Sequence, residues 1–166
     1  MSDQPQLPER DWPEARKMKA AGKTAWAYFS NLVKLLIEKL GEEKTCEILT
    51  ELMTRNAQKF VPAGFHQFGI GDDDPWGIAS YFKLATGDVI GYDAELIKDG
   101  EKVTYKLNPP CLWFPDLDVP PAVCRALGEF EREACRMVNP KVGVTITHLL
   151  TAGDPYCAFV FEKKED

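Results

Sequence analysis

Two short runs of alternating apolar residues lie on either side of the turn Lys98-Asp99-Gly100-Glu101. The apolar positions are Ile90, Tyr92, Ala94 and Leu96 before the turn, and Val103, Tyr105 and Leu107 after it. An Asp-Gly pair between two runs of period two is the strongest short-range signal of a β-hairpin. We therefore expect an antiparallel pair of strands within residues 90–107.

A second hairpin is expected near the C-terminus. Its strands are Val142–Thr151 and Tyr156–Phe161, joined by a turn that contains Gly153-Asp154-Pro155. The residues that share one face of the first strand are Val144, Ile146, His148 and Leu150. Because this pair is apolar on both faces in places, a central position in the sheet is predicted.

Helical periodicity dominates most of the remaining chain. The helices are expected at Lys23–Leu40, Glu42–Phe60, residues 75–85 and residues 121–137. Two stretches without periodicity, Val61–Gly71 and Cys111–Val119, are interpreted as irregular segments. The predicted fold class is α+β, with N-terminal helices packed on a small antiparallel sheet made of two β-hairpins separated by a helix.

The 166 residues suit a single domain, expected at residues 21–162. A flexible N-terminal arm is predicted at residues 1–20 and a frayed tail at residues 163–166. The N-terminal stretch lacks the apolar segment of a signal peptide, and no run approaches the roughly 18 apolar residues that a membrane span requires. We therefore expect no membrane partner and a cytoplasmic location.

Charge and cysteine usage exclude three further classes. The formal net charge is −6, and no run of Lys or Arg is longer than a pair, so nucleic acid is not expected as a partner. The cysteines are Cys46, Cys111, Cys124, Cys135 and Cys157. Their number is odd and they form no C-x-x-C pair, so neither a disulfide framework nor a zinc ribbon is expected in a reducing compartment.

His148 is the first candidate for chemistry, because it occupies a core-facing position in an apolar strand. If Leu150 lies opposite Cys157, then His148 becomes a diagonal neighbour of Cys157, within reach for side chains. Such a pair can act as nucleophile and base, or supply two metal ligands. The structural alternative is a histidine that bonds a backbone carbonyl. A slip of one residue in the register would abolish the pairing.

Cys111, in an irregular segment, is the third catalytic candidate.

A divalent metal is left open, without an assigned set of ligands. The carboxylates of Asp72-Asp73-Asp74 suit a hard cation. The segment lacks the glycine and distal Glu of a calcium loop, however, and an Asp before Pro75 caps a helix N-terminus. Helix capping is the preferred interpretation.

Aromatic side chains gather in the segments that should surround a pocket, which is typical of small-molecule sites. The candidate ligand-binding residues are Trp76, Phe82, Tyr92, Trp113, Phe114 and, at the lip, His66. An exposed apolar loop at Leu112–Phe114 would instead dock a partner or a second copy, which makes a homodimer a further hypothesis.

The C-terminal third resembles a known family. Cys111 after a proline pair, Cys124, Cys135 and the ending Leu149-x-Thr151-x-Gly153-Asp154-x-x-Cys157-x-Phe159 resemble the L-2-amino-thiazoline-4-carboxylic acid hydrolase family. The ending TAGDPYCAFVF is also similar to the last hairpin of vinyl-reductase-type ligand-binding domains, and LGEEKTCEILTELM is similar to the Gly-Glu-Glu helix start of the hydrolase family. The resemblance implies helices around a small antiparallel sheet, with a pocket between them. It matches Cys111, Cys135 and Cys157 to family cysteines.

Two functions follow from these observations. The first is a hydrolase that opens a small cyclic compound containing C–N and C–S bonds, with Cys157 or Cys111 as nucleophile or metal ligand and His148 as base. The alternative is a non-catalytic, vinyl-reductase-like module that binds a small apolar or aromatic ligand. The Trp-Phe-Pro loop after Cys111 and the presence of His148 depart from the family pattern and leave the substrate open.

Overall fold

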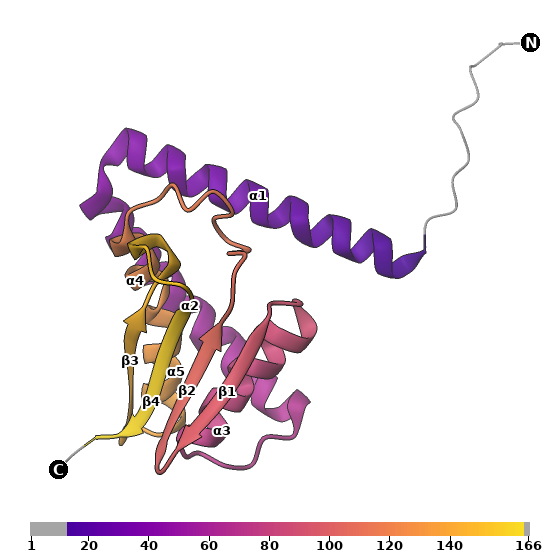
Figure 1. The fold of residues 1–166 in the computed structure, drawn as a ribbon, viewed down its shortest axis with the longest axis vertical. Coiled ribbons are helices and arrows are strands. Elements are labelled where there is room, and N and C mark those ends of the chain that lie inside the picture. The colour runs from indigo at the N-terminus through magenta and orange to yellow at the C-terminus, as the bar shows by residue number, and fades with distance from the viewer. Residues whose placement is uncertain (1–12, 165–166) are drawn as a thin grey trace, which may run out of the picture.

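The structure, a computed structural model, describes residues 13–164 (Figure 1). Two long helices come first, α1 (Glu14–Leu40) and α2 (Glu42–Phe68). The remaining elements are α3 (Pro75–Phe82), the π-helix η1 (Lys83–Val89), β1 (Ala94–Asp99), β2 (Lys102–Leu107), α4 (Pro121–Leu127), α5 (Glu129–Val138), β3 (Val142–His148), the 3-10 turn η2 (Leu150–Ala152) and β4 (Cys157–Lys163). The predicted α+β class is confirmed, since helices pack on one antiparallel sheet.

The two predicted hairpins join into a single sheet with the strand order β1-β2-β4-β3. The connection is the antiparallel pair β2–β4, in which Tyr105 lies opposite Phe159 and both side chains are buried. Lys106 follows Tyr105 and takes the other face, because successive side chains of a strand alternate. In Figure 1, α2 and α5 lie behind the four strands, so the sheet has one covered and one open face.

Helix α2 continues through Pro62 to Phe68, although residues 61–71 were expected to be irregular. A proline inside a helix removes one backbone hydrogen bond. Tertiary packing offsets this loss, because Val61 is fully buried and the ring of Phe65 stacks on Tyr81 of α3, with centroids 5.5 Å apart. The helix ends at Gly69, which has the left-handed conformation that favours glycine.

The single helix predicted for residues 121–137 is two helices, α4 and α5, that meet at Gly128. Ile146 of β3 packs at this junction. A Cβ atom on Gly128 would come within 2.5 Å of Ile146 Cδ1, so the missing side chain lets the strand approach the break closely. The break changes the direction of the chain where it borders the cavity described below.

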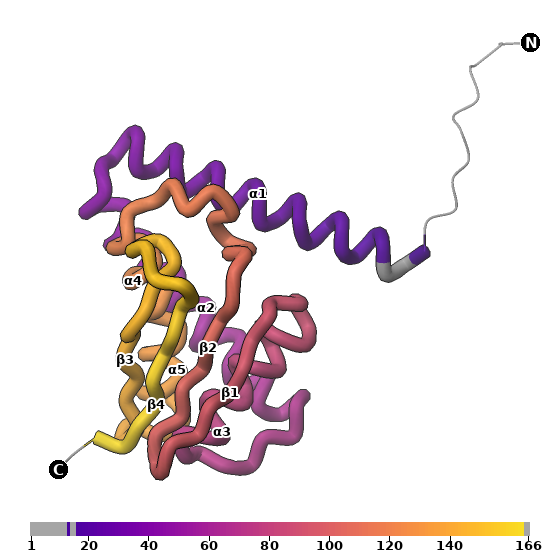
Figure 2. The backbone as a smooth tube through the Cα atoms, viewed as in Figure 1, coloured from indigo at the N-terminus to yellow at the C-terminus, as the bar shows by residue number. Residues whose placement is uncertain are grey.

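Helix α1 begins at Glu14 and therefore includes residues 14–20 of the predicted flexible arm. Residues with high helix propensity, such as Ala, Lys, Arg and Met, fill this stretch. Figure 2 shows that the N-terminal half of α1 extends past the rest of the fold. Strand β4 reaches Lys163, the first residue of the predicted tail. Residues 1–12 and 165–166 lie outside the described residues.

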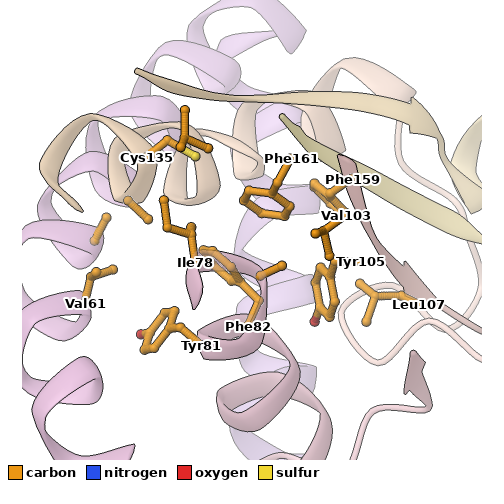
Figure 3. Packing of buried hydrophobic residues seen from close by; sticks show 14 of the residues in the cluster. Val61, Ile78, Tyr81, Phe82, Val103, Tyr105, Leu107, Cys135, Phe159 and Phe161 are labelled. Atoms are coloured by element: carbon orange, nitrogen blue, oxygen red, sulfur yellow. The ribbon is translucent and has the colours of Figure 1, made fainter. Parts of the chain in front are cut away.

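The main core lies between α3 and the covered face of the sheet (Figure 3). Phe82 stacks on Phe161 with ring centroids 5.6 Å apart, and Tyr105 packs beside Phe82 at 6.0 Å. A second core holds α1 against the segment before α4 and is formed by Val33, Leu49, Cys111, Phe114, Val119, Val123, Ala126 and Leu150. Side chains from both cores border one cavity.

Candidate ligand-binding cavity

A cavity of about 450 Å³ lies between the helices and the covered face of the sheet. It draws side chains from α1 (Phe29), α2 (Leu52, Asn56, Phe60), α3 and η1 (Phe82, Thr86), β2 (Tyr105, Leu107), α5 (Phe130, Glu131) and β4 (Cys157, Phe159). Carbon atoms form most of this wall, and the volume falls within the range of roughly 300–1,000 Å³ that is usual for ligand pockets. The cavity is therefore large enough for a small organic molecule.

Four of the predicted ligand-binding residues line this cavity: Phe82, Tyr92, Trp113 and Phe114. The Tyr92 hydroxyl accepts a hydrogen bond from the Leu112 backbone N–H at 3.1 Å. This bond ties the segment after β2 to the core and holds Trp113 and Phe114 against the cavity. These aromatic side chains, predicted from the sequence to line a pocket, therefore come together from three separate segments.

Trp76 and His66 lie elsewhere, so the prediction that they border this cavity is wrong. Trp76, at the start of α3, is 40% exposed and lies beside the Lys98 ammonium group, 5.8 Å from the ring centroid. It contributes to a separate hollow of about 130 Å³. His66 lies on an exposed face of α2, because this helix continues where an irregular link was expected.

His148 is on the open face of the sheet rather than the covered face. A β-bulge between Ile146 and His148 inserts one extra residue into β3, so that His148 pairs with Ala158. Each added residue turns the following side chains to the opposite face. The imidazole packs on the ring of Tyr156, with centroids 4.8 Å apart, and bonds the hydroxyl of Thr147 at 3.0 Å. His148 is not among the residues that line the cavity. The expected inward position is wrong, and the structure separates His148 from the face that carries Cys157.

Three cysteines do line the cavity: Cys111, Cys124 and Cys157. Each sulfur accepts a hydrogen bond: Cys157 from the Leu150 N–H at 3.3 Å, Cys111 from the Phe114 N–H at 3.4 Å, and Cys124 from the Thr151 hydroxyl at 3.3 Å. Burial raises the pKa of the Cys157 thiol and raises that of Cys124 to about 11. Since the thiolate is the nucleophilic form, burial holds these two thiols in the less reactive state.

No group of three or more His, Cys, Asp or Glu side chains within residues 13–164 is arranged to hold a metal ion. The carboxylate of Asp74 accepts a hydrogen bond from the Gly77 N–H at 2.8 Å, which confirms the predicted helix cap. Cys135, the third family-matched cysteine, is buried in the main core and does not line the cavity.

Two polar groups in the cavity were missed by the sequence interpretation. Glu131 of α5 borders it, and burial raises the pKa of this carboxyl from 4.5 to about 7, outweighing its backbone hydrogen bond and the Arg132 charge. Its side chain keeps some accessible surface, as expected of a group that faces an enclosed apolar space. The available signal was its position: Glu131 follows Leu127 by four residues and therefore lies on the apolar stripe of the helix.

Tyr105 of β2 is the second polar group. The residue is 1% exposed, and its hydroxyl has no hydrogen-bond partner among the described residues. Burial raises the pKa of Tyr105; the Thr86 side chain interacts with this hydroxyl and lowers that pKa by less, although the pair does not meet hydrogen-bond geometry. A buried hydroxyl without a partner is uncommon, because its desolvation is not offset. In Figure 3 this hydroxyl lies at the end of the ring that is directed away from Val103.

Fold and cavity together define a small α+β domain with an aromatic-lined cavity. Solved structures share this fold. The trafficking protein particle complex subunit 3 from Naegleria fowleri, covalently bound to palmitic acid, has a similar structure with a TM-score of 0.65 and 13% identity, covering 89% of this chain and 97% of that one. The phenol-responsive sensory domain of the transcription activator PoxR, solved with phenol, has a TM-score of 0.62 and 12% identity, covering 83% and 74%.

At these identities the similarity establishes the fold. No family model matches the sequence, and no curated protein matches it closely. Within the described part of the chain, no helix is both long and apolar enough to cross a lipid bilayer.

Proposed function

We propose that this domain binds a small apolar or aromatic molecule in the cavity between its helices and its sheet. The observation that supports this proposal best is the aromatic-lined cavity of about 450 Å³. Most of the wall is apolar, so an apolar ligand that displaces water from it gains free energy. Two proteins of similar fold support the proposal, because one is a sensory domain that binds phenol and the other holds palmitic acid.

Filling the cavity tests this function. Ala85 of η1 lines the cavity, whereas Ala63 of α2 is exposed. We expect the neutral fluorescent probe N-phenyl-1-naphthylamine to bind the native domain, and Ala85→Leu to lower its affinity at least about tenfold by occupying part of the volume. Ala63→Leu should leave the affinity unchanged within about twofold. Native mass spectrometry of freshly purified protein should also show a co-purified small molecule. Equal affinity in both variants would place the probe elsewhere and contradict the proposal.

Membership of the L-2-amino-thiazoline-4-carboxylic acid hydrolase family, and hydrolysis of a small cyclic compound, is the second candidate. The observation in its favour is that Cys111 and Cys157 border the same cavity. The position of His148 on the open face leaves such a nucleophile without the proposed base. Ligand binding without catalysis is therefore the function that the geometry supports better.

A homodimer is proposed as well, through α1 and not through the loop Leu112–Phe114. That loop was expected to be exposed, but Phe114 is fully buried and Trp113 packs against Phe29 of α1. On α1, Tyr28 is 72% exposed, Leu32 53% and Leu35 49%, at spacings of four and three that place them along one side of the helix. Pairing with a second copy would bury this surface. Size-exclusion chromatography with light scattering tests it: Leu32→Glu should convert a dimer to a monomer.

The five unpaired thiols fit a reducing compartment such as the cytoplasm.

A further inference from the structure

The carboxylate of Glu131 differs from its neighbours on α5 because it has no cationic partner. Glu129 forms ion pairs with Arg132 and Arg136, and Glu133 accepts hydrogen bonds from Gln58 at 2.8 Å and Arg136 at 2.7 Å. Glu131 forms no ion pair within residues 13–164. An isolated carboxylate in an apolar space is strongly disfavoured, and such groups are either protonated or paired.

The guanidinium nearest in sequence does not fill this role. Arg132 donates from Nε to Glu129 at 2.8 Å and from Nη2 to the Arg125 carbonyl at 2.6 Å. Its Nε and Nη2 atoms are therefore bonded to other groups, and Arg132 forms no ion pair with Glu131. The charge of Glu131 raises the pKa of three other groups: the phenols of Tyr81 and Tyr105 and the thiol of Cys135. All three groups are neutral in their ordinary state. The Arg132 charge opposes the rise in the Glu131 pKa, but no cationic side chain among the described residues forms an ion pair with this carboxylate.

The cavity that Glu131 borders is lined by aromatic rings. Tyr81 and Phe82 of α3, Tyr105 of β2 and Phe130 of α5 all line the cavity with Glu131. Phe82 lies within 6.0 Å of Tyr105 and 5.9 Å of Phe130, measured between ring centroids. Aromatic rings attract cations through their quadrupoles, and the attraction grows when water is excluded. The oxygen of the unpartnered Tyr105 hydroxyl is also free to accept a hydrogen bond.

We propose, on the basis of the ligand-binding function above, that the cavity selects a primary amine carried on an apolar or aromatic body. The protonated amine would place its charge beside the Glu131 carboxylate, donate a second N–H to the Tyr105 hydroxyl and pack its carbon body against the surrounding rings. One ligand then satisfies both polar groups that the protein leaves without partners. The net charge of −6 favours the approach of a cation over that of an anion.

Other head groups satisfy the site less well. A carboxylic acid would bring a second negative charge beside Glu131, where water cannot screen the repulsion. An alcohol can donate a hydrogen bond to the carboxylate but leaves its charge uncompensated. Hydrogen bonds between two charged groups are roughly twice as strong as neutral ones, so the amine should bind the most tightly.

Three probes with one ring system and arms of equal length separate these cases: 2-(2-naphthyl)ethylamine, 2-(2-naphthyl)ethanol and 3-(2-naphthyl)propanoate. Isothermal titration calorimetry at pH 7.5 should show the amine binding at least about tenfold more tightly than the alcohol, and the propanoate most weakly. Glu131→Gln should remove the preference for the amine while leaving the alcohol within about threefold. Glu51→Gln changes an exposed carboxylate of α2 and should retain the preference.

A second measurement uses the native chain alone. Amine binding at pH 6.5 should release a proton from Glu131, detected as a binding enthalpy that depends on the ionisation enthalpy of the buffer; alcohol binding should not. If the alcohol binds as tightly as the amine, or Glu131→Gln keeps the preference, amine selection is overturned and the ligand-binding function stands. If neither the three probes nor N-phenyl-1-naphthylamine binds, both are overturned.

Discussion

Gly64 of α2 lies against the ring of Tyr81 in α3 so closely that a Cβ atom on Gly64 would come within 2.3 Å of Tyr81 Cε2. Tyr81 is 5% exposed and is itself packed by Phe65 and Phe82. The same ring lines the cavity. Helix packing and the shape of the ligand site are therefore linked through one pair of residues.

Gly64→Ala should test this link. The added methyl group forces the Tyr81 ring to move, and overpacking of this kind costs roughly 1–3 kcal/mol. We expect the free energy of unfolding to fall by that amount in urea denaturation and the affinity for N-phenyl-1-naphthylamine to fall with it. Gly22→Ala is the matched control, because a Cβ atom on Gly22 of α1 would lie 3.8 Å from its nearest neighbour, Trp26 Nε1, which is an ordinary contact. There, alanine should stabilise the helix by about 0.5–1 kcal/mol. Equal effects at both sites would contradict the packing argument.

The Glu131 carboxyl should make stability depend on pH. Its folded-state pKa of about 7 lies above the ordinary 4.5, so below pH 4.5 both states are protonated and Glu131 has no effect. Between pH 4.5 and 7 the unfolded state loses this proton first. Stability then falls with rising pH by up to about 3 kcal/mol, and the loss stays constant above pH 7.

Comparing native protein with Glu131→Gln isolates this effect from the other titrating groups. The variant should show a higher free energy of unfolding than the native chain at pH 8 and a similar one at pH 4.5. Chemical denaturation at several pH values measures the difference. A difference that does not change between pH 4.5 and 8 would show that Glu131 is not desolvated.

The thiols of the cavity should react slowly and without help from His148. A pKa of about 11 at Cys124, against an ordinary 9.0, lowers its thiolate fraction at neutral pH about a hundredfold. Burial acts in the same direction on Cys157. In iodoacetamide labelling followed by peptide mass spectrometry, His148→Ala should leave the rate at Cys157 unchanged. A fall of more than about threefold would instead support the nucleophile–base pair that the hydrolase hypothesis requires.

The helix cap at Asp74 offers a test of local stability. Its carboxylate accepts from the Gly77 N–H at 2.8 Å, and replacing such a cap by alanine costs about 0.5–2 kcal/mol. Asp74→Ala should lower the thermal midpoint accordingly. Asp73→Ala removes an exposed carboxylate next to it whose contact with Asn139 is long, at 3.4 Å, and should change stability by less than about 0.5 kcal/mol.

Local signals were sufficient for most elements. The Asp99-Gly100 turn and the alternation around it identify β1 and β2, and the Asp-Pro start identifies α3, because turn and cap chemistry act between residues close in sequence. The same reasoning failed at Pro62, where burial of the following turn outweighs the lost hydrogen bond. It also failed at Gly128, where α4 gives way to α5 and Ile146 of β3 packs too closely for a side chain.

The site was predictable only in part. The aromatic residues of the cavity were identified, since aromatic clusters in irregular segments favour pockets, and four of the six ligand-binding candidates line it. The catalytic pair was misplaced because a single bulged residue in β3 moves His148 to the other face, and no pattern in the sequence marks a bulge there. The sequence did not reveal that the Tyr105 hydroxyl lacks a hydrogen-bond partner, because its possible partners lie on segments far away in the chain.

The amino-acid sequence by itself determined the periodicities, the turns and the caps, and through them an α+β domain with two hairpins, because these depend on residues within a few positions of one another. Only the tertiary structure decided which face each strand presents, that a cavity forms between the helices and the sheet, and that Glu131 borders it without an ion-pair partner among the described residues. Those properties depend on burial, and burial is set by contacts between segments that are far apart in the chain.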